Sequence, residues 1–102
     1  MVVKKDGRRE RYDRGKILGG LLKAAEKRPI PITELETVAD EIETLLADRP
    51  EKEMSTKEIG TYIMDSLRRL DKVAYVRFAS VYREFKDIGE FLEELKLLLN
   101  ER

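Results

Sequence analysis

The sequence has 102 residues, of which 41% are hydrophobic and 41% charged, a size and composition that suit one compact domain. It contains no cysteine and no histidine, which excludes disulfides, thiol nucleophiles, imidazole bases and the usual zinc ligands. No apolar run is long enough to span a bilayer and no signal-peptide core follows the N-terminus, so we expect a soluble, cytoplasmic protein without membrane contacts.

The net charge is zero, but the charges are distributed unevenly along the chain. Residues 1–28 hold ten Lys or Arg against four Asp or Glu, whereas residues 29–65 hold three against ten. A basic N-terminal third beside an acidic middle predicts a local site for an anion and not a surface for bulk nucleic-acid binding. Accidental clustering of solubilising charges is the competing interpretation.

Two short extended segments at the N-terminus, within residues 2–12, are separated by Asp6-Gly7. Asp-Gly in this setting is typical of a two-residue type I′ turn, which needs positive φ at both central residues. The sequence therefore predicts a β-hairpin. A helix is predicted to follow it, with Asp13 as its N-cap and an end near Arg28.

A second helix is predicted to begin at a capping box formed by Thr33 and Glu36, and to end where Pro50 breaks the apolar pattern. After it, residues 52–54 are a candidate for a third short strand. Ser55 and Glu58 repeat the capping-box spacing and predict the start of a third helix.

Two further helices are predicted in the last third of the sequence. Asp71 is a suitable N-cap for the fourth, and Asp87 with Glu90 repeats the capping spacing for the fifth. The fifth helix has a strongly apolar stripe, which can pack on the bundle or on another subunit.

The fold class predicted from these elements is α+β and mainly α: a bundle of four or five helices capped by a small β-hairpin or three-stranded sheet. We expect one domain over residues 1–102, with the hairpin at residues 2–12 and the helical bundle at residues 13–100.

Enzymatic chemistry is not expected, and no residue is predicted to be catalytic or to bind a metal. The sequence has no phosphate-binding loop of the G-x-x-x-x-G-K-[ST] type, because Gly15-Lys16 is followed by Ile17 and not by a hydroxyl residue. Acidic pairs such as Glu93-Glu94 fall on predicted helix surfaces, where solvation explains them.

A phosphate site built from Lys4, Lys5 and Lys16 is the first binding hypothesis. Lys16 falls in the first turn of a predicted helix, where the helix dipole and backbone N–H groups also favour an anion. Scattered solubilising lysines are the alternative interpretation, and by themselves the more common one. Since neighbouring strand residues point to opposite faces, Lys4 and Lys5 can meet one ligand only near the strand end or through a backbone group.

Direct contact with nucleic acid is the second binding hypothesis. It uses the arginines of the basic segment: Arg8, Arg9, Arg11 and Arg14. The acidic middle of the chain would repel the same phosphate backbone, and no aromatic stacking platform accompanies the arginines.

The order of residues in two parts of the chain resembles a known family. Residues 2–10, followed by Tyr12-Asp13 and Lys16-Ile17, are similar to the opening of ATP-cone domains, which regulate ribonucleotide reductases. Leu70–Phe85, together with Glu26-Lys27-Arg28-Pro29, resembles more specifically the cone of bacterial transcriptional repressors of ribonucleotide reductase genes. The similarity extends to about residue 98.

This resemblance implies a three-stranded sheet over a helical bundle, with a nucleotide bound beneath the sheet. It implies nucleotide contacts of five kinds: main-chain contacts with the base from Val2 and Val3, phosphate contacts from Lys4, Lys5 and Lys16, contacts near the base or sugar from Glu10 and Asp13, a hydroxyl contact from Thr56, and closure of the site by Tyr82 or Lys86.

The resemblance also implies a regulatory domain whose effector is ATP or dATP and whose state as a homo-oligomer carries the signal. Any Mg²⁺ would be held by the phosphates, since no carboxylate cluster is clearly placed for it, and no zinc is expected. Repressors of this kind bind promoter DNA through an N-terminal zinc ribbon, which a sequence without cysteine and histidine cannot form. Contact with DNA would therefore be only indirect, through that missing domain; a DNA-associating or structural module is the alternative function.

Overall fold

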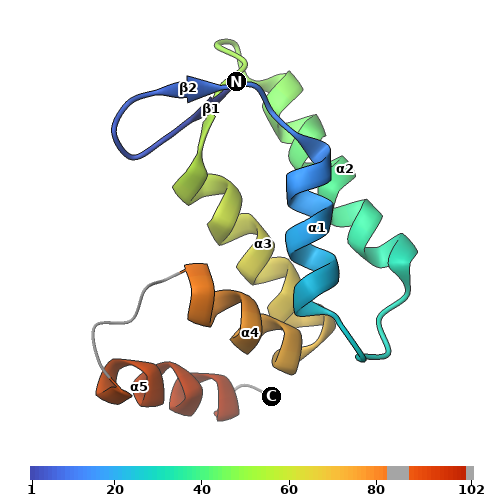
Figure 1. Ribbon diagram of the computed structural model, residues 1–102, viewed down its shortest axis with the longest axis vertical. Helices are drawn as coiled ribbons and strands as arrows, with labels where there is room; N and C mark the ends of the chain where they lie inside the picture. Colours follow the sequence, from blue (N-terminus) through green and yellow to red (C-terminus); the bar gives the residue numbers. More distant parts are fainter. Residues whose placement is uncertain (83–87, 101–102) are drawn as a thin grey trace.

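The structure, a computed structural model, describes residues 1–82 and 88–100. Its elements in chain order are β1 (Val2–Val3), β2 (Arg9–Glu10), α1 (Arg14–Ala24), α2 (Ile32–Asp48), β3 (Met54–Ser55), α3 (Thr56–Leu70), α4 (Lys72–Tyr82) and α5 (Ile88–Leu99). Helices α1, α2 and α3 run beside one another, with the strands at one end of the bundle and α4 and α5 at the other (Figure 1). This arrangement of five helices and three strands in the described part of the chain confirms the predicted mainly helical α+β fold.

The sheet brings together the strand before α1 and the strand after α2, with β1 between them. Its strand order is β2-β1-β3, with β1 antiparallel to β2 and parallel to β3. Val2 lies opposite Glu10 on one side and opposite Met54 on the other. The third strand begins two residues later than predicted and ends one residue later, because Lys52 has a φ of 55° and belongs to a turn in which its N–H donates to the Arg49 carbonyl.

The hairpin turn differs from the predicted type I′ turn. Within this turn only Gly7 has positive φ, at 87°, whereas a type I′ turn needs two such residues. The Gly7 N–H donates to the Lys4 carbonyl at 2.9 Å, and the Lys4 N–H donates to the Arg8 carbonyl at 2.7 Å. The connection is therefore a three-residue loop ending in a left-handed glycine, and the Asp6 side chain fixes it by accepting from the Arg8 N–H at 3.1 Å.

The predicted boundaries of the first two helices need correction. Helix α1 ends at Ala24 and not near Arg28, because Lys27 adopts a φ of 60° and Arg28 precedes a proline, which disfavours helical backbone. Helix α2 begins before Thr33, which lies in its first turn and is not the N-cap. Pro31 takes the N-cap position with extended backbone, and no side chain caps the helix there.

The predicted starts of α3 and α4 are confirmed. The Ser55 hydroxyl accepts from the Glu58 N–H at 3.0 Å, and the Glu58 carboxylate accepts from the Ser55 N–H at 3.1 Å. A bond from Arg49 and one from the Ser55 backbone hold the pKa of Glu58 below its usual range. Asp71 caps α4 by accepting from the Ala74 N–H at 3.0 Å. The predicted cap at Asp87 lies outside the described residues.

The core lies among α1 to α4, and its largest fully buried side chains are Tyr75, Leu21, Leu35, Ile42 and Leu67. Helix α5 joins it at Leu98 and through Tyr75, whose hydroxyl donates to Glu94 and accepts from Arg68 at 2.8 Å. None of the helices described is long and apolar enough to cross a lipid bilayer.

Candidate nucleotide site

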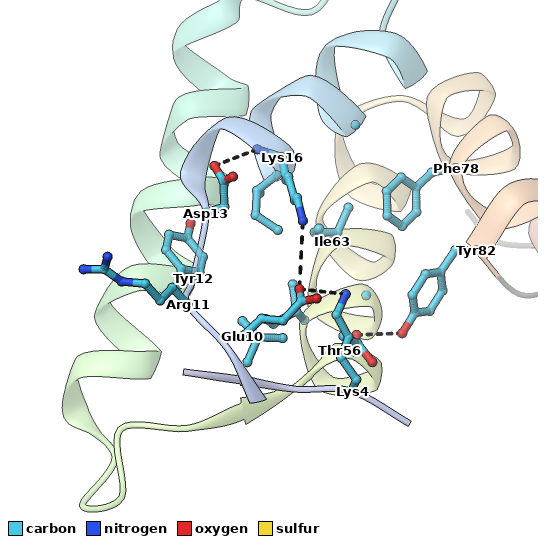
Figure 2. Close-up of a pocket in the computed structure, with 15 residues that line it drawn as sticks. Lys4, Glu10, Arg11, Tyr12, Asp13, Lys16, Thr56, Ile63, Phe78 and Tyr82 are labelled. Atoms are coloured by element: carbon cyan, nitrogen blue, oxygen red, sulfur yellow. Dashed lines mark hydrogen bonds and ion pairs between the residues drawn. The ribbon is translucent and has the colours of Figure 1, made fainter. Parts of the chain in front are cut away.

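A cavity of about 220 Å³ lies between the sheet and the helices, and we call it the site cavity (Figure 2). Its lining combines apolar helix residues with charged residues from the hairpin and the start of α1. The lining residues are Val2, Lys4, Glu10, Arg11, Tyr12, Asp13, Lys16, Ile17, Gly20, Thr56, Ile59, Gly60, Ile63, Phe78 and Tyr82. The cavity therefore offers an apolar interior beside a cationic edge.

Two lysines share one carboxylate at this edge. The Glu10 Oε2 atom lies 3.2 Å from the Lys4 Nζ and 3.9 Å from the Lys16 Nζ, as the dashed lines in Figure 2 show. The hairpin register explains the first pair, since Glu10 lies opposite Val2 and Lys4 follows Val2 on the same face of the strand. Two ammonium groups beside one carboxylate leave a net positive charge, and exposed ion pairs of this kind contribute little to stability.

Asp13 holds the start of α1 at the cavity wall. Its carboxylate accepts from the Lys16 N–H at 3.3 Å, which is the predicted N-cap bond. This bond occupies one of the backbone N–H groups that were expected to favour an anion. The Lys16 side chain, 71% exposed, is thus the more accessible cationic part of that residue.

The opposite wall comes from α3 and α4. The Tyr82 hydroxyl donates to the Thr56 carbonyl at 2.7 Å, and burial raises the pKa of this hydroxyl, which keeps it protonated as a donor. The Phe78 and Tyr82 rings are stacked, with centroids 5.7 Å apart and an angle of 22° between their planes. Phe78 both packs against the core and lines the cavity.

A larger groove, which we call the basic groove, adjoins the site cavity and shares Lys4, Gly20, Thr56, Phe78 and Tyr82 with it. Its charged lining holds seven Lys or Arg and two acids: Lys4, Lys5, Arg8, Lys23, Lys27, Lys57, Arg77, Asp6 and Glu26. Such a surface attracts an anion that extends out of the cavity.

The structure brings together most of the residues that the resemblance assigned to the site. Seven of them line the site cavity: Val2, Lys4, Glu10, Asp13, Lys16, Thr56 and Tyr82. Lys5, which lies in the hairpin loop after β1, lines the basic groove instead, and Val3 lines neither space. Lys86 lies outside the described residues.

Sequence reasoning missed the apolar half of the lining, contributed by Ile17, Ile59, Ile63 and Phe78, and the glycine at position 60. Their helical spacing was a visible signal, but it indicates a buried face without telling whether other side chains or an open space lie against it.

Three of the arginines proposed for nucleic-acid contact are engaged in ion pairs. Arg8 Nε lies 2.7 Å from Asp6, and Arg9 Nε lies 2.8 Å from Glu53. Arg14 joins α1 to α2 at 2.9 Å from Asp40 and 2.6 Å from Glu43. Glu43 also accepts from the Tyr12 hydroxyl at 3.1 Å; burial first, and then this bond, raise the pKa of Tyr12 to about 12.

Comparison with known proteins shows the family of the chain. Residues 1–88 match the ATP cone domain family. The whole chain is similar to the transcriptional repressor NrdR of Koribacter versatilis (strain Ellin345), at 61% identity over 102 residues, and to that of Acidobacterium capsulatum, at 60%. It is also 56% identical to the NrdR of Solibacter usitatus and covers 67% of that protein.

The chain spans less than two thirds of the length of the first two relatives, 63% and 61%. Their name describes a transcriptional regulator, which agrees with the expectation that the chain is not an enzyme.

Proposed function

Because the chain belongs to the ATP cone domain family, we propose that it is a regulatory domain that binds ATP or dATP in the site cavity and does not hydrolyse it. The observation that carries this proposal is the combination of an apolar cavity with Lys4 and Lys16 at its edge. Apolar side chains pack against the faces of a planar base, and ammonium groups bind phosphates by charge-assisted hydrogen bonds.

The residues present fit an adenine nucleotide. Ile17, Ile59 and Ile63 supply an apolar surface for the base, and Lys4 and Lys16 supply charge for the phosphates. Glu10 would lose its lysine partners to the phosphates and gain acceptor capacity for a sugar hydroxyl. Any Mg²⁺ would be carried by the phosphates. Lys5, in the basic groove, would contact the part of the phosphate chain that leaves the cavity.

Calorimetric titration of the chain with ATP and with dATP, each with Mg²⁺, tests the proposal. We expect binding of both at micromolar to low millimolar concentration, with one site that involves the cavity. Absence of heat with either nucleotide at millimolar concentration, while circular dichroism shows a folded protein, would falsify it.

We also propose that the bound nucleotide is read out as a change in homo-oligomeric state. Helix α5 supports this proposal, because Leu92, Leu97 and Leu99 are exposed on it by 49%, 61% and 76%. Linkage requires ATP and dATP to differ in affinity for two assembly states. Sedimentation velocity with each nucleotide should give different mass distributions; identical distributions over a hundredfold range of protein concentration would contradict this readout.

Transcriptional repression, as the names of the relatives state for those proteins, is proposed for this chain only as part of a larger protein in which a zinc ribbon contacts DNA. Direct binding through the basic hairpin is less favoured, because Arg8, Arg9 and Arg14 already have acidic partners. Direct binding predicts an affinity for duplex DNA that falls steeply with salt, whereas the proposed function predicts little affinity of this chain for DNA at 150 mM salt.

A further inference from the structure

Gly60 occupies a position where glycine has no conformational reason to be. It is buried within α3, and its φ is not positive. Glycine is a poor helix former, so glycine in the second turn of a helix lowers the stability of that helix. A lack of space for a larger side chain would explain why glycine is nevertheless found there. Space is lacking, because a Cβ atom built on Gly60 would overlap Cζ, Cε1 and the hydroxyl oxygen of Tyr82.

The missing side chain of Gly60 forms a seat for the Tyr82 ring. The ring lies against the first turns of α3, with its hydroxyl bonded to the Thr56 carbonyl at 2.7 Å. Phe78 stacks against it from the preceding turn of α4. The glycine contact, the hydroxyl bond and the stacked ring together fix the side chain of Tyr82 in one place.

Tyr82 in this seat is a wall shared by the site cavity and the basic groove, since it lines both. The site cavity of about 220 Å³ is below the range of roughly 300–1,000 Å³ that is common for small-molecule sites. A Tyr82 ring that leaves the seat has to move toward one of these two spaces. A small displacement of the Tyr82 ring would then be enough to exclude a base from the site cavity or to obstruct the phosphates in the basic groove.

From these contacts we infer that Gly60 is a positioning residue for the nucleotide: it seats Tyr82 as the fixed wall between the part of the site that receives the base and the groove that receives the phosphates. The inference rests on the proposed nucleotide binding. It assigns to Gly60, which does not itself carry a binding group, control over how tightly the ligand is held.

The test compares Gly60→Ala with Gly19→Ala. Gly19 is also inside a helix, but it is exposed and a Cβ there would meet nothing within 4 Å. Because alanine favours helix, Gly19→Ala should raise the Tm slightly and leave the Kd for ATP within twofold of the unaltered chain. Gly60→Ala should weaken ATP binding at least fivefold at 25 °C, with the protein still folded by circular dichroism.

A double-mutant cycle of Gly60→Ala and Tyr82→Ala, measured by thermal melts, shows whether contact with the Tyr82 ring causes the effect of the added methyl group. Gly60→Ala should lower the Tm when Tyr82 is present and raise it when Tyr82 is alanine, because only the ring makes the added methyl group unfavourable. A Kd for Gly60→Ala within fivefold of the unaltered chain, or the same change of Tm in both backgrounds, would overturn the inference. If the unaltered chain binds no ATP, the proposed function fails and this inference with it, whereas binding that survives Gly60→Ala removes the inference alone.

Discussion

Two clusters of oppositely charged side chains in this chain differ in exposure and in charge balance. At the edge of the site cavity, Lys4 and Lys16 share the Glu10 carboxylate, with distances of 3.2 and 3.9 Å and with all three side chains at least one third exposed. Between the end of α1 and the start of α4, Arg28 donates from Nε to both carboxylate oxygens of Asp71, at 3.2 and 3.0 Å. The first cluster has surplus positive charge and the second is balanced.

The two clusters also differ in how many other interactions their carboxylate makes. The Asp71 side chain is only 8% exposed and also caps α4, so its ion pair is part of the fold. Burial works to raise the pKa of Asp71, but the bonds from the Ala74 N–H and from Arg28 outweigh it and hold this pKa below its usual range. Charges that a ligand can recruit are thus those whose present partner is shared, exposed and not itself a helix cap.

The largest expected effect is on binding at the first cluster. The double substitution Lys4→Ala and Lys16→Ala should weaken ATP binding by a factor of about 100 or more, since each charge-assisted bond contributes on the order of 1.5–3 kcal/mol. The Tm of the ligand-free chain should change by no more than about 2 °C, because exposed ion pairs stabilise little. Calorimetry and thermal melts measure the two quantities.

The matched control removes two cations elsewhere. Arg69→Ala with Lys96→Ala changes the net charge equally, and neither residue lines the site cavity or the basic groove. Binding of ATP should be nearly unchanged in this control. Equal weakening in both double variants would mean that overall charge, and not the first cluster, determines affinity.

The second cluster should respond in the opposite way. Asp71→Ala removes both the cap of α4 and the partner of Arg28, and we expect a loss of about 2 kcal/mol in unfolding free energy, or roughly 10 °C in Tm. Urea denaturation measures this loss. Binding of ATP by the folded variant should remain within a few-fold of the unaltered chain; a selective loss of binding with an unchanged Tm would reverse the roles assigned to the two clusters.

A smaller effect is expected from the charge of Asp71 alone. Asn is also a good N-cap, so Asp71→Asn keeps the cap of α4. It should lower the unfolding free energy by about 1 kcal/mol or less at pH 7. Because the pKa of Asp71 is lower in the folded than in the unfolded chain, its charge stabilises above about pH 4, and this stabilisation is lost as the pH falls through the folded-state value.

Urea titrations at several pH values check this dependence. The difference in unfolding free energy between the unaltered chain and Asp71→Asn should be constant from pH 7 to pH 5 and shrink below pH 4. Asp65→Asn, on the exposed side of α3, serves as the control. A difference that does not change with pH would show that the Asp71 charge is not what stabilises the second cluster.

The smallest effect is expected at Arg14. Its two acidic partners on α2 are exposed side chains, so Arg14→Ala should lower the Tm by only a few degrees and leave ATP binding unchanged. Filter binding with duplex DNA should detect no difference between the two proteins. A clear loss of DNA binding in the variant would instead support the alternative function of the basic hairpin.

Local signals were enough to predict much of this fold. Ser55 and Glu58 satisfy each other across one helical turn, and Asp71 bonds a backbone N–H three residues away, so both helix starts could be found without knowledge of the rest of the chain. Thr33 and Glu36 have the same spacing, but the prediction of a helix start at Thr33 was wrong, because α2 has its N-cap two residues earlier, at Pro31. A capping residue therefore predicts a helix start only where the residues before it are not already helical.

The site was predictable in its charges and less so in its shape. The charge pattern singled out Lys4 and Lys16, and the resemblance added Glu10. The hairpin register brings Lys4 and Glu10 together, whereas Lys16 approaches Glu10 from α1. The apolar wall at Ile59 and Ile63 follows the stripe of α3, and only the packing of the sheet and α4 around it decides that a cavity remains. Whether a cavity remains therefore depends on contacts between residues distant in the sequence, such as Val2 with Met54 and Thr56 with Tyr82, which no local pattern contains.

The pairing of β1 with β3 has a consequence for the order in which the molecule assembles. Val2 meets Met54 only when the chain of α1 and α2 folds back on itself, and pairing between residues so distant in sequence forms slowly. We therefore expect the sheet that roofs the cavity to be completed late in folding. A ligand held beneath it would bind only fully assembled molecules, so the cell's nucleotide pool would protect finished copies of this domain from unfolding and leave incomplete ones exposed to proteolysis.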